Sequence, residues 1–390
     1  MTPSTLAKLN LVRDESGVGE IAFVDLPAQQ RRIREAVETR LSRVLDHGRY
    51  IGGPELDELE AALITRTGAK VAISCASGTA ALIIALLSRG LKSEDAVFVP
   101  AFTYNATVNA VLLAGATPIF VDIDPDTYNI DPADLAAKVE SIKKEGRFQP
   151  KAVIPVDLFG SPADYNRINA LAEREGLFVL GDGAQSFGGR YNNRDVGNLA
   201  AATAVSFFPG KAFGAYGDAG AVFSQGPDDQ ALYESIRWHG TDDSRKISVR
   251  VGFNGRMDSF QAAVLLEKLA IFDEELEVRR HVAATYDECL SAVAQPQHHL
   301  PGAVSGCGYY ALRVKDRERV IADLSAAGVP TAVYYSTPLH KMPVFEPYAP
   351  EAGLPNTDLV AAEILSLPMH GYLTERQVDY ICDAVTAALR

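Results

Sequence analysis

Short apolar segments alternate with helical patterns along the first 225 residues of the chain. The apolar segments show no polar alternation and predict strands at 71–74, 97–99, 118–121, 153–156, 178–180, 204–207 and 220–223. Apolar residues at helical spacing predict helices at 33–44, 56–63, 79–88, 107–114, 135–143 and 168–175. Buried strands separated by helices are typical of a mostly parallel sheet that helices cover on both faces.

A different pattern begins after residue 225. It consists of a long helical pattern at 259–290, a strand at 309–314, a helix at 317–326, a Pro-rich loop at 336–350 and a helix at 375–389. We therefore predict an α/β fold with a loose extension at 1–20, a large domain at 21–270 and a smaller C-terminal α+β domain at 271–390.

The composition narrows the class of protein. The 390 residues carry 37 Lys and Arg against 50 Asp and Glu, a net charge of −13, which gives no general attraction for nucleic acid or an anionic membrane. The N-terminal segment is charged, and no stretch approaches the ~18 apolar residues of a membrane span, so we expect a cytoplasmic protein. The cysteines are scattered without a C-x-x-C motif and predict no disulfide framework, metal site or redox motif: Cys75, Cys289, Cys307 and Cys382.

Candidate chemistry is sought where the predicted strands end, because ligands of an open parallel sheet bind beyond its carboxyl ends. The segment 75–79 (CASGT) follows a strand and opens a helix, so its small residues and free N–H groups suggest a phosphate cradle. The alternative is an ordinary helix cap by Ser77 or Thr79. The next strand is followed by Tyr104, which either stacks on a flat ring or belongs to the core.

Two ionisable residues follow later strands. Asp182 ends a buried strand, where a carboxylate needs a cationic or hydrogen-bonding partner unless it caps the next segment. Lys211 lies in a loop rich in glycine and aromatic residues, which argues against an exposed lysine and favours a desolvated, nucleophilic amine. An anion cradle, an aromatic, a carboxylate and a lysine together match the needs of pyridoxal phosphate (PLP).

The segments 206–211 (SFFPGK) and 217–220 (GDAG) resemble the hallmark of the DegT/DnrJ/StrS sugar aminotransferases, which are fold type I PLP enzymes. The resemblance extends from about residue 23 through the rest of the chain and includes 50–55 (YIGGPE), 182–185 (DGAQ) and 252–256 (GFNGR). Gly181 and Gly183 stand where Glu and Ala are usual, and neither change removes a functional group.

The resemblance implies a role for each matching residue. Lys211 would hold the cofactor covalently and move protons, Asp182 would pair with its ring nitrogen, Gln185 would contact its 3-hydroxyl and Tyr104 would stack on its ring. Gly78, Thr79 and Ser206 would hold the phosphate. Asn254 would reach the phosphate of the neighbouring subunit, which implies a homodimer with shared active sites. The substrate-binding positions would be Arg256, Tyr334 and Tyr335.

The resemblance also implies a reaction, the transfer of an amino group from glutamate to a nucleotide-linked keto-sugar. The likeness is nearest to members that act on the C3 ketone of UDP-2-acetamido-2-deoxy-3-oxo-glucuronate, for surface polysaccharide such as lipopolysaccharide. Two alternatives remain, a C4-specific enzyme for a GDP-, dTDP- or UDP-linked keto-deoxysugar and a non-catalytic regulator of the same fold. The alternative for Arg256 is a surface ion pair with Asp258 or Glu267.

Overall fold

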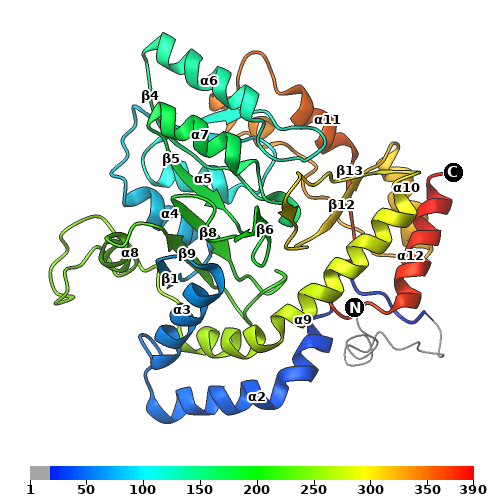
Figure 1. The fold of residues 1–390 in the computed structure, drawn as a ribbon, viewed down its shortest axis with the longest axis horizontal. Coiled ribbons are helices and arrows are strands. Elements are labelled where there is room, and N and C mark those ends of the chain that lie inside the picture. Colours follow the sequence, from blue (N-terminus) through cyan, green and yellow to red (C-terminus); the bar gives the residue numbers. More distant parts are fainter. Residues whose placement is uncertain (1–17) are drawn as a thin grey trace.

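The computed structural model describes residues 18–390 and contains a seven-stranded central sheet (Figure 1). The strand order is β1-β9-β8-β5-β4-β2-β3. The bounds are β1 Val71–Cys75, β2 Asp95–Pro100, β3 Thr117–Val121, β4 Gln149–Val153, β5 Phe178–Asp182, β8 Ala202–Ser206 and β9 Gly220–Ser224. Within this sheet β9 runs antiparallel to its neighbours β1 and β8, and the other pairs are parallel, which confirms the predicted mostly parallel sheet.

The prediction for the fourth strand is wrong in position. Residues 153–156 were expected to form it, but β4 ends at Val153. The strand begins with Gln149 and Lys151, which are exposed, so its first half does not stand out as an apolar run. Beyond it, Val156 makes only an isolated bridge to Asp182.

Helices cover both faces of the sheet, as the alternating pattern predicts. One face carries α4 Gly78–Leu87, α5 Ala106–Leu113 and α8 Asp229–Arg237. The other carries α3 Pro54–Thr67, α6 Pro132–Glu145, α7 Tyr165–Glu175 and the first half of α9 Ser259–Leu290. The helix α2 Leu26–His47 packs against α9. Because both sheet faces are covered, strands such as β1 and β2 are buried at every position.

The second half of α9 enters a separate hydrophobic core in the C-terminal part of the chain. This part contains β10 Gln295–Pro296, β12 Tyr310–Arg313, β13 Ile364–Leu367, α10 Arg317–Ala326, α11 Pro355–Glu363 and α12 Glu375–Ala388. The first three form an antiparallel sheet in the order β10-β12-β13. The predicted helices at 259–290 and 317–326 are confirmed, whereas α8, α11 and β13 were not anticipated.

Short elements connect these parts. A second small sheet joins β6 Arg190–Tyr191 and β7 Arg194–Asp195 to β11 Ala303–Val304. Single 3-10 turns lie at Leu158–Gly160, Leu339–Lys341 and Glu346–Tyr348. No helix in the described part of the chain is both long and apolar enough to cross a membrane.

The segment before α2 packs on the C-terminal core. Ile21 is buried in that core, and the amide N–H of Met369 donates to the carbonyl of Phe23 at 3.4 Å. The side chain of Gln377 on α12 donates to the carbonyl of Glu20 at 3.1 Å. Most of the predicted loose extension, residues 1–17, lies outside the described residues.

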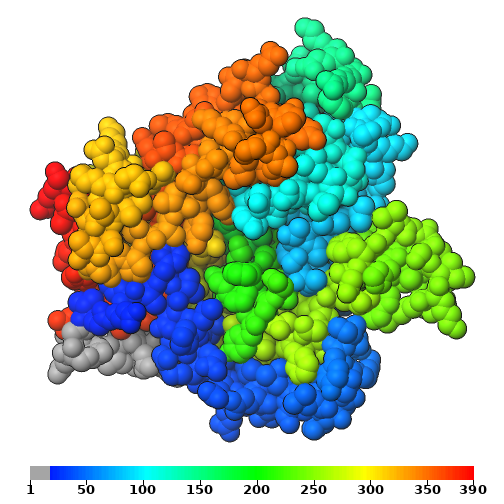
Figure 2. All heavy atoms as spheres, turned by 180° about the vertical axis from the view of Figure 1, so that it is seen from behind, coloured from blue at the N-terminus to red at the C-terminus, as the bar shows by residue number. Residues whose placement is uncertain are grey.

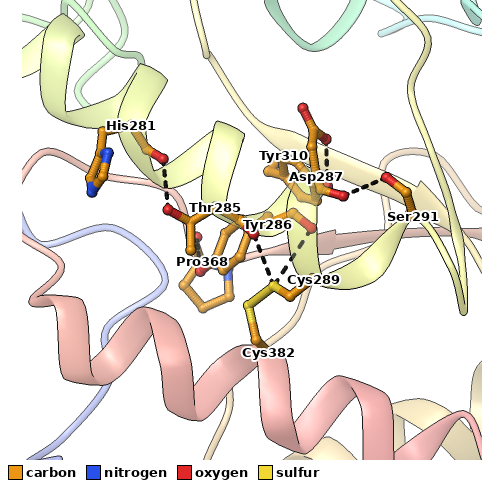
Figure 3. Close-up of a disulfide and its surroundings, with 9 residues drawn as sticks. All are labelled: His281, Thr285, Tyr286, Asp287, Cys289, Ser291, Tyr310, Pro368 and Cys382. Atoms are coloured by element: carbon orange, nitrogen blue, oxygen red, sulfur yellow. Dashed lines mark hydrogen bonds between the residues drawn. A yellow bond between two sulfur atoms is a disulfide. The ribbon is translucent and has the colours of Figure 1, made fainter.

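A disulfide joins Cys289 near the end of α9 to Cys382 on α12 (Figure 3). The absence of a Cys motif had predicted no such link, because residues 93 positions apart carry no local sign of their proximity. Their Cα atoms lie 6.2 Å apart, within the range that a disulfide spans. The other two cysteines, Cys75 and Cys307, are buried and free.

We expect reduction of the Cys289–Cys382 disulfide to lower the melting temperature. Its 93-residue separation corresponds to at most about 4–5 kcal/mol of stability in the chain-entropy model, with part of that reached in practice. Thermal unfolding with and without a thiol reductant measures the effect. The double variant C289A/C382A is the control, because it should melt at the same temperature in both conditions. An unchanged melting temperature of the reduced wild-type protein would contradict the expectation.

Candidate active site

The loops that follow β1, β2, β5 and β8 meet at the carboxyl edge of the central sheet. Gly78, after β1, lies directly against Ser206 at the end of β8, since a Cβ atom on Gly78 would come within 2.7 Å of the Ser206 Cβ. Thr107, after β2, donates a hydrogen bond to Asp182 at the end of β5 at 2.8 Å. The sheet thus brings together residues that are up to 128 positions apart, from 78 to 206.

The N-terminus of α4 forms an anion-binding cradle. Ser77 is the N-cap, and its hydroxyl accepts from the amide N–H of Ala80 at 3.1 Å. The N–H groups of Gly78 and Thr79 have no protein acceptor among the described residues, and helix N-termini with free N–H groups favour anions. Ser206 adds a hydroxyl beside Gly78. The capping alternative is therefore correct for Ser77 but leaves two amides free, and a phosphate fits them.

Asp182 is a buried carboxylate with a partner for each oxygen. Its Oδ2 accepts from the Thr107 hydroxyl at 2.8 Å and its Oδ1 from the amide N–H of Ala184 at 3.1 Å. Burial raises the pKa of Asp182, while these hydrogen bonds and the charge of Lys211 act in the opposite direction. A carboxylate held in this way can pair with a cationic nitrogen brought by a ligand.

Lys211 lies in the loop after β8, and the residue as a whole is partly buried. Burial of its amine lowers the pKa of Lys211 to about 8, and the Asp182 carboxylate partly opposes that shift. Its Nζ lies 5.6 Å from the ring centroid of Tyr309. An amine with this pKa is partly neutral near physiological pH, so it can act as a nucleophile and move protons.

Gln185 and two tyrosines complete the cluster. The Oε1 of Gln185 accepts from the amide N–H of Phe159 at 2.6 Å, and its Nε2 donates to the Tyr335 hydroxyl at 3.1 Å. Tyr104 is 56% exposed, so it does not belong to the core, and its ring centroid lies 6.1 Å from that of Tyr335. Tyr334 packs against Tyr309, the tyrosine beside Lys211, with ring centroids 4.9 Å apart, and the ring of Tyr335 lies 5.8 Å from that of Tyr334.

The two remaining predicted residues lie at the outer side of the cradle. Asn254 is exposed, and the carbonyl of the next residue, Gly255, accepts from the amide N–H of Ala76 at 2.8 Å. The guanidinium of Arg256 lies 4.3 Å from the ring centroid of Trp238. Among the described residues Arg256 makes no ion pair, and Glu267 is bound by Arg40 instead, so the alternative of a surface ion pair with Asp258 or Glu267 is wrong.

Sequence reasoning missed three residues of this site. They are Thr107, which bonds Asp182, Tyr309, which lies beside the Lys211 amine, and Phe159, whose amide holds Gln185. Each contact joins residues far apart in the chain, and no local motif marks it. In the space-filling view the green surface, around residue 200, lies between the blue, cyan and orange parts of the chain (Figure 2).

Comparisons with known proteins show the family and the fold. The model of the DegT/DnrJ/EryC1/StrS aminotransferase family matches residues 31–386, and the chain belongs to this family. It is 44% identical over 367 residues, 94% of this chain and 99% of the relative, to UDP-2-acetamido-2-deoxy-3-oxo-D-glucuronate aminotransferase of Pseudomonas aeruginosa. A crystal structure of a family aminotransferase from Brucella abortus superposes with a TM-score of 0.93 at 43% identity, covering 95% of this chain and 99% of that one.

A third comparison concerns the cofactor. The Bacillus subtilis NtdA structure, with its bound cofactor PMP, has a TM-score of 0.86 at 28% identity and covers 97% of this chain and 87% of that one. The fold is therefore that of a fold type I aminotransferase, as predicted, and the chain is a PLP-dependent aminotransferase of nucleotide-linked sugars.

The low pKa of Lys211 leads to a test with cofactor-free protein. Covalent capture of PLP needs the neutral amine, so its rate should rise with pH and reach half of its maximum near pH ~8. Asp182→Asn removes the negative charge that opposes the lowering of the Lys211 pKa. The midpoint of the rate against pH should therefore move to lower pH. Capture is followed by absorbance from pH 6 to 12, with Nα-acetyl-lysine, whose side-chain amine is free, as the control. A midpoint near that of the free amine would contradict the expectation.

Proposed function

We propose that this enzyme transfers the amino group of glutamate to the C3 ketone of UDP-2-acetamido-2-deoxy-3-oxo-glucuronate, a step in surface polysaccharide synthesis. The observation that carries this substrate is the 44% identity to the P. aeruginosa enzyme with that name, over 94% of this chain. The intact pair of Lys211 and Asp182 supports a catalytic role over that of a non-catalytic regulator.

The positions of the residues support a role for each of them in this reaction. The N-terminus of α4 and the Ser206 hydroxyl bind the cofactor phosphate, and Asp182 keeps the ring nitrogen protonated. PLP, when bound, draws electrons away from the carbon that carries the amino group. Lys211 anchors the cofactor and then accepts and returns the proton of that carbon, a task that suits an amine whose pKa is about 8. Gln185 orients the ring from the side of Tyr335.

A panel of keto-sugar nucleotides tests the substrate. UDP-linked 3-oxo-glucuronate, its 3-oxo-glucosamine analogue and 4-keto deoxysugars linked to UDP, GDP and dTDP are each incubated with enzyme, PLP and glutamate, and the products are read by mass spectrometry. We expect the first compound to be aminated at least about tenfold faster than the others, a difference of 1.4 kcal/mol. Lys211→Ala is the control and should abolish turnover. Preference for a 4-keto sugar would overturn the C3 assignment.

Local cations offset the repulsion between an acidic protein and an anionic substrate. The chain carries −13, whereas the substrate carries a carboxylate and a diphosphate. Arg256 and Arg245 lie 4.3 and 3.8 Å from the Trp238 ring centroid, and neither makes an ion pair among the described residues. Burial lowers the pKa of Arg256, and the charge of Arg245 acts in the same direction. A bound anion would reduce the repulsion between the Arg256 and Arg245 cations. Arg256 can bind a carboxylate through two parallel hydrogen bonds.

We expect Arg256→Ala to slow the keto-sugar half-reaction by about tenfold or more, because a charge-assisted contact is lost, and to spare the glutamate half-reaction. Single-turnover measurements of each half-reaction separate the two effects. Arg147→Ala is the matched control, since it removes another guanidinium that lies over an aromatic ring, that of Phe148, just before β4 and away from the carboxyl edge of the sheet. Equal damage by both variants would assign the effect to the loss of positive charge from the chain, and equal damage to both half-reactions would assign Arg256 to glutamate.

The loop that carries Asn254 supports a homodimer with shared sites. Bridges from Trp238 to Asn254 and from Thr241 to Ser248 form a hairpin beyond α8, which projects from the body of the molecule (Figure 1). Its apolar residues are exposed, by 62% at Ile247, 55% at Val249 and 78% at Val251. Exposed apolar side chains grouped on a projecting hairpin are typical of a protein interface. A second copy of the chain would cover them and receive Asn254 at its cofactor phosphate.

We expect the double variant V249D/V251D to be monomeric, because two buried carboxylates would oppose the interface. Light scattering gives the mass, and titration with PLP gives the affinity, which should fall with the loss of Asn254 from the partner's site. Leu113→Asp is the control, since Leu113 is also exposed, by 66%, but lies on α5 away from the hairpin. A wild-type monomer with full activity would remove Asn254 from the site.

A further inference from the structure

Asp157 is a completely buried carboxyl group to which none of the roles above is assigned. It lies in the segment after β4, beside the end of β5. The amide N–H of Asp157 donates to the carbonyl of Asp182 at 3.0 Å, and that of Asp182 donates to the carbonyl of Pro155 at 2.8 Å. Two backbone hydrogen bonds therefore connect the segment around Asp157 to Asp182, which bears the carboxylate of the site.

The Asp157 side chain holds the far end of the turn that Asp182 begins. Its Oδ2 accepts from the hydroxyl of Ser186 at 2.9 Å, and its Oδ1 accepts from the amide N–H of Ala163 at 3.0 Å. Ser186 is itself fully buried, and its amide donates to the carbonyl of Gly183 at 3.1 Å within the turn. The five-residue turn 182–186 is thus tied at both ends to Asp157.

The same segment also holds Gln185. The amide N–H of Phe159 donates to the Gln185 side chain at 2.6 Å. The segment is fixed in turn by buried Asn129, which accepts from the amide of Leu158 at 3.0 Å and donates to the carbonyl of Ser161 at 2.9 Å. Residues 157–159 therefore hold the turn 182–186 in place through hydrogen bonds.

The charge state of Asp157 suits this position. Burial raises the pKa of Asp157 to about 7, and the negative charge of Asp182 acts in the same direction. The groups that face it are Asp182, the Tyr165 hydroxyl on α7 and Ser186. Burial and the charge of Asp182 both favour the neutral form of Asp157, which avoids a second buried negative charge beside Asp182.

We propose that Asp157 is a positioning residue: through Ser186 it fixes the turn that carries Asp182 and Gln185, and it thereby sets the affinity for PLP and the orientation of the bound cofactor. The proposal rests on the assignment of Asp182 and Gln185 to the cofactor under the proposed function. It does not depend on which sugar is aminated.

Cofactor-free protein tests the proposal with two readouts besides activity, the dissociation constant for PLP and the circular dichroism of the bound cofactor. We expect Asp157→Ala and Ser186→Ala to weaken PLP binding roughly tenfold, since a buried hydrogen bond is lost and its partner is left unpaired, and to change the dichroism. Asp157→Asn keeps an oxygen that accepts from the Ala163 amide and gains an N–H that can donate to the Ser186 oxygen. Its PLP affinity and its dichroism should therefore stay close to those of the wild-type protein.

Thr357→Ala is the matched control. The Thr357 hydroxyl bonds another buried carboxylate, Asp122, at 2.7 Å, next to the edge strand β3. It should lower the melting temperature about as much as Ser186→Ala and leave PLP binding unchanged. If Asp157→Ala does not fold, Ser186→Ala and Asp157→Asn carry the test.

Two results would overturn the proposal. One is wild-type affinity and dichroism in folded Ser186→Ala protein, and the other is an equal loss of affinity in Thr357→Ala, which would mean general destabilisation. A failure of the sugar panel leaves these contrasts in place, so the two proposals fail separately.

Discussion

A carboxylate that is removed from water is unstable unless hydrogen bonds or cations compensate the loss of hydration, and Asp182 is such a group. It is 5% exposed at the end of β5. Its compensation comes from Thr107 in the first turn of α5, which follows β2, from the backbone of its own turn and, through space, from Lys211. The site can form only when β2, β5 and β8 are in register, because each contributes one of these groups. The catalytic geometry and the stability of the sheet therefore depend on the same contacts.

In the same arrangement, Lys211 and Asp182 each oppose the pKa shift that burial causes in the other. Burial alone would lower the pKa of Lys211 and raise that of Asp182, so that both groups would favour their neutral forms. Their mutual attraction opposes both pKa shifts. The Lys211 amine, whose pKa is about 8, can release and take back a proton near physiological pH, which suits a site that must pass protons in both directions of a reversible reaction.

The sequence predicts more of the fold than of the candidate site. Uninterrupted apolar runs disclosed the buried strands and helices, but apolar content does not encode strand direction, so antiparallel β9 was not foreseen. Lys211 and Asp182 could be predicted because each follows a strand in a distinctive loop. Thr107, Tyr309 and Asp157 could not, since their contacts with the site cross up to 98 positions, from Lys211 to Tyr309. The Cys289–Cys382 link was missed for the same reason.

The contacts of the segment before α2 have a consequence for how the chain folds during synthesis. Ile21 and the carbonyls of Glu20 and Phe23 pack on α12 and on the loop before it, more than 340 positions later. Such long-range contacts cannot form until α12 has left the ribosome, whereas the strands from β1 to β9 lie within residues 71–224 and can pair earlier. The C-terminal core is therefore the last part to close, and an apolar surface around Ile21 stays open for most of translation, when a chaperone has access to it.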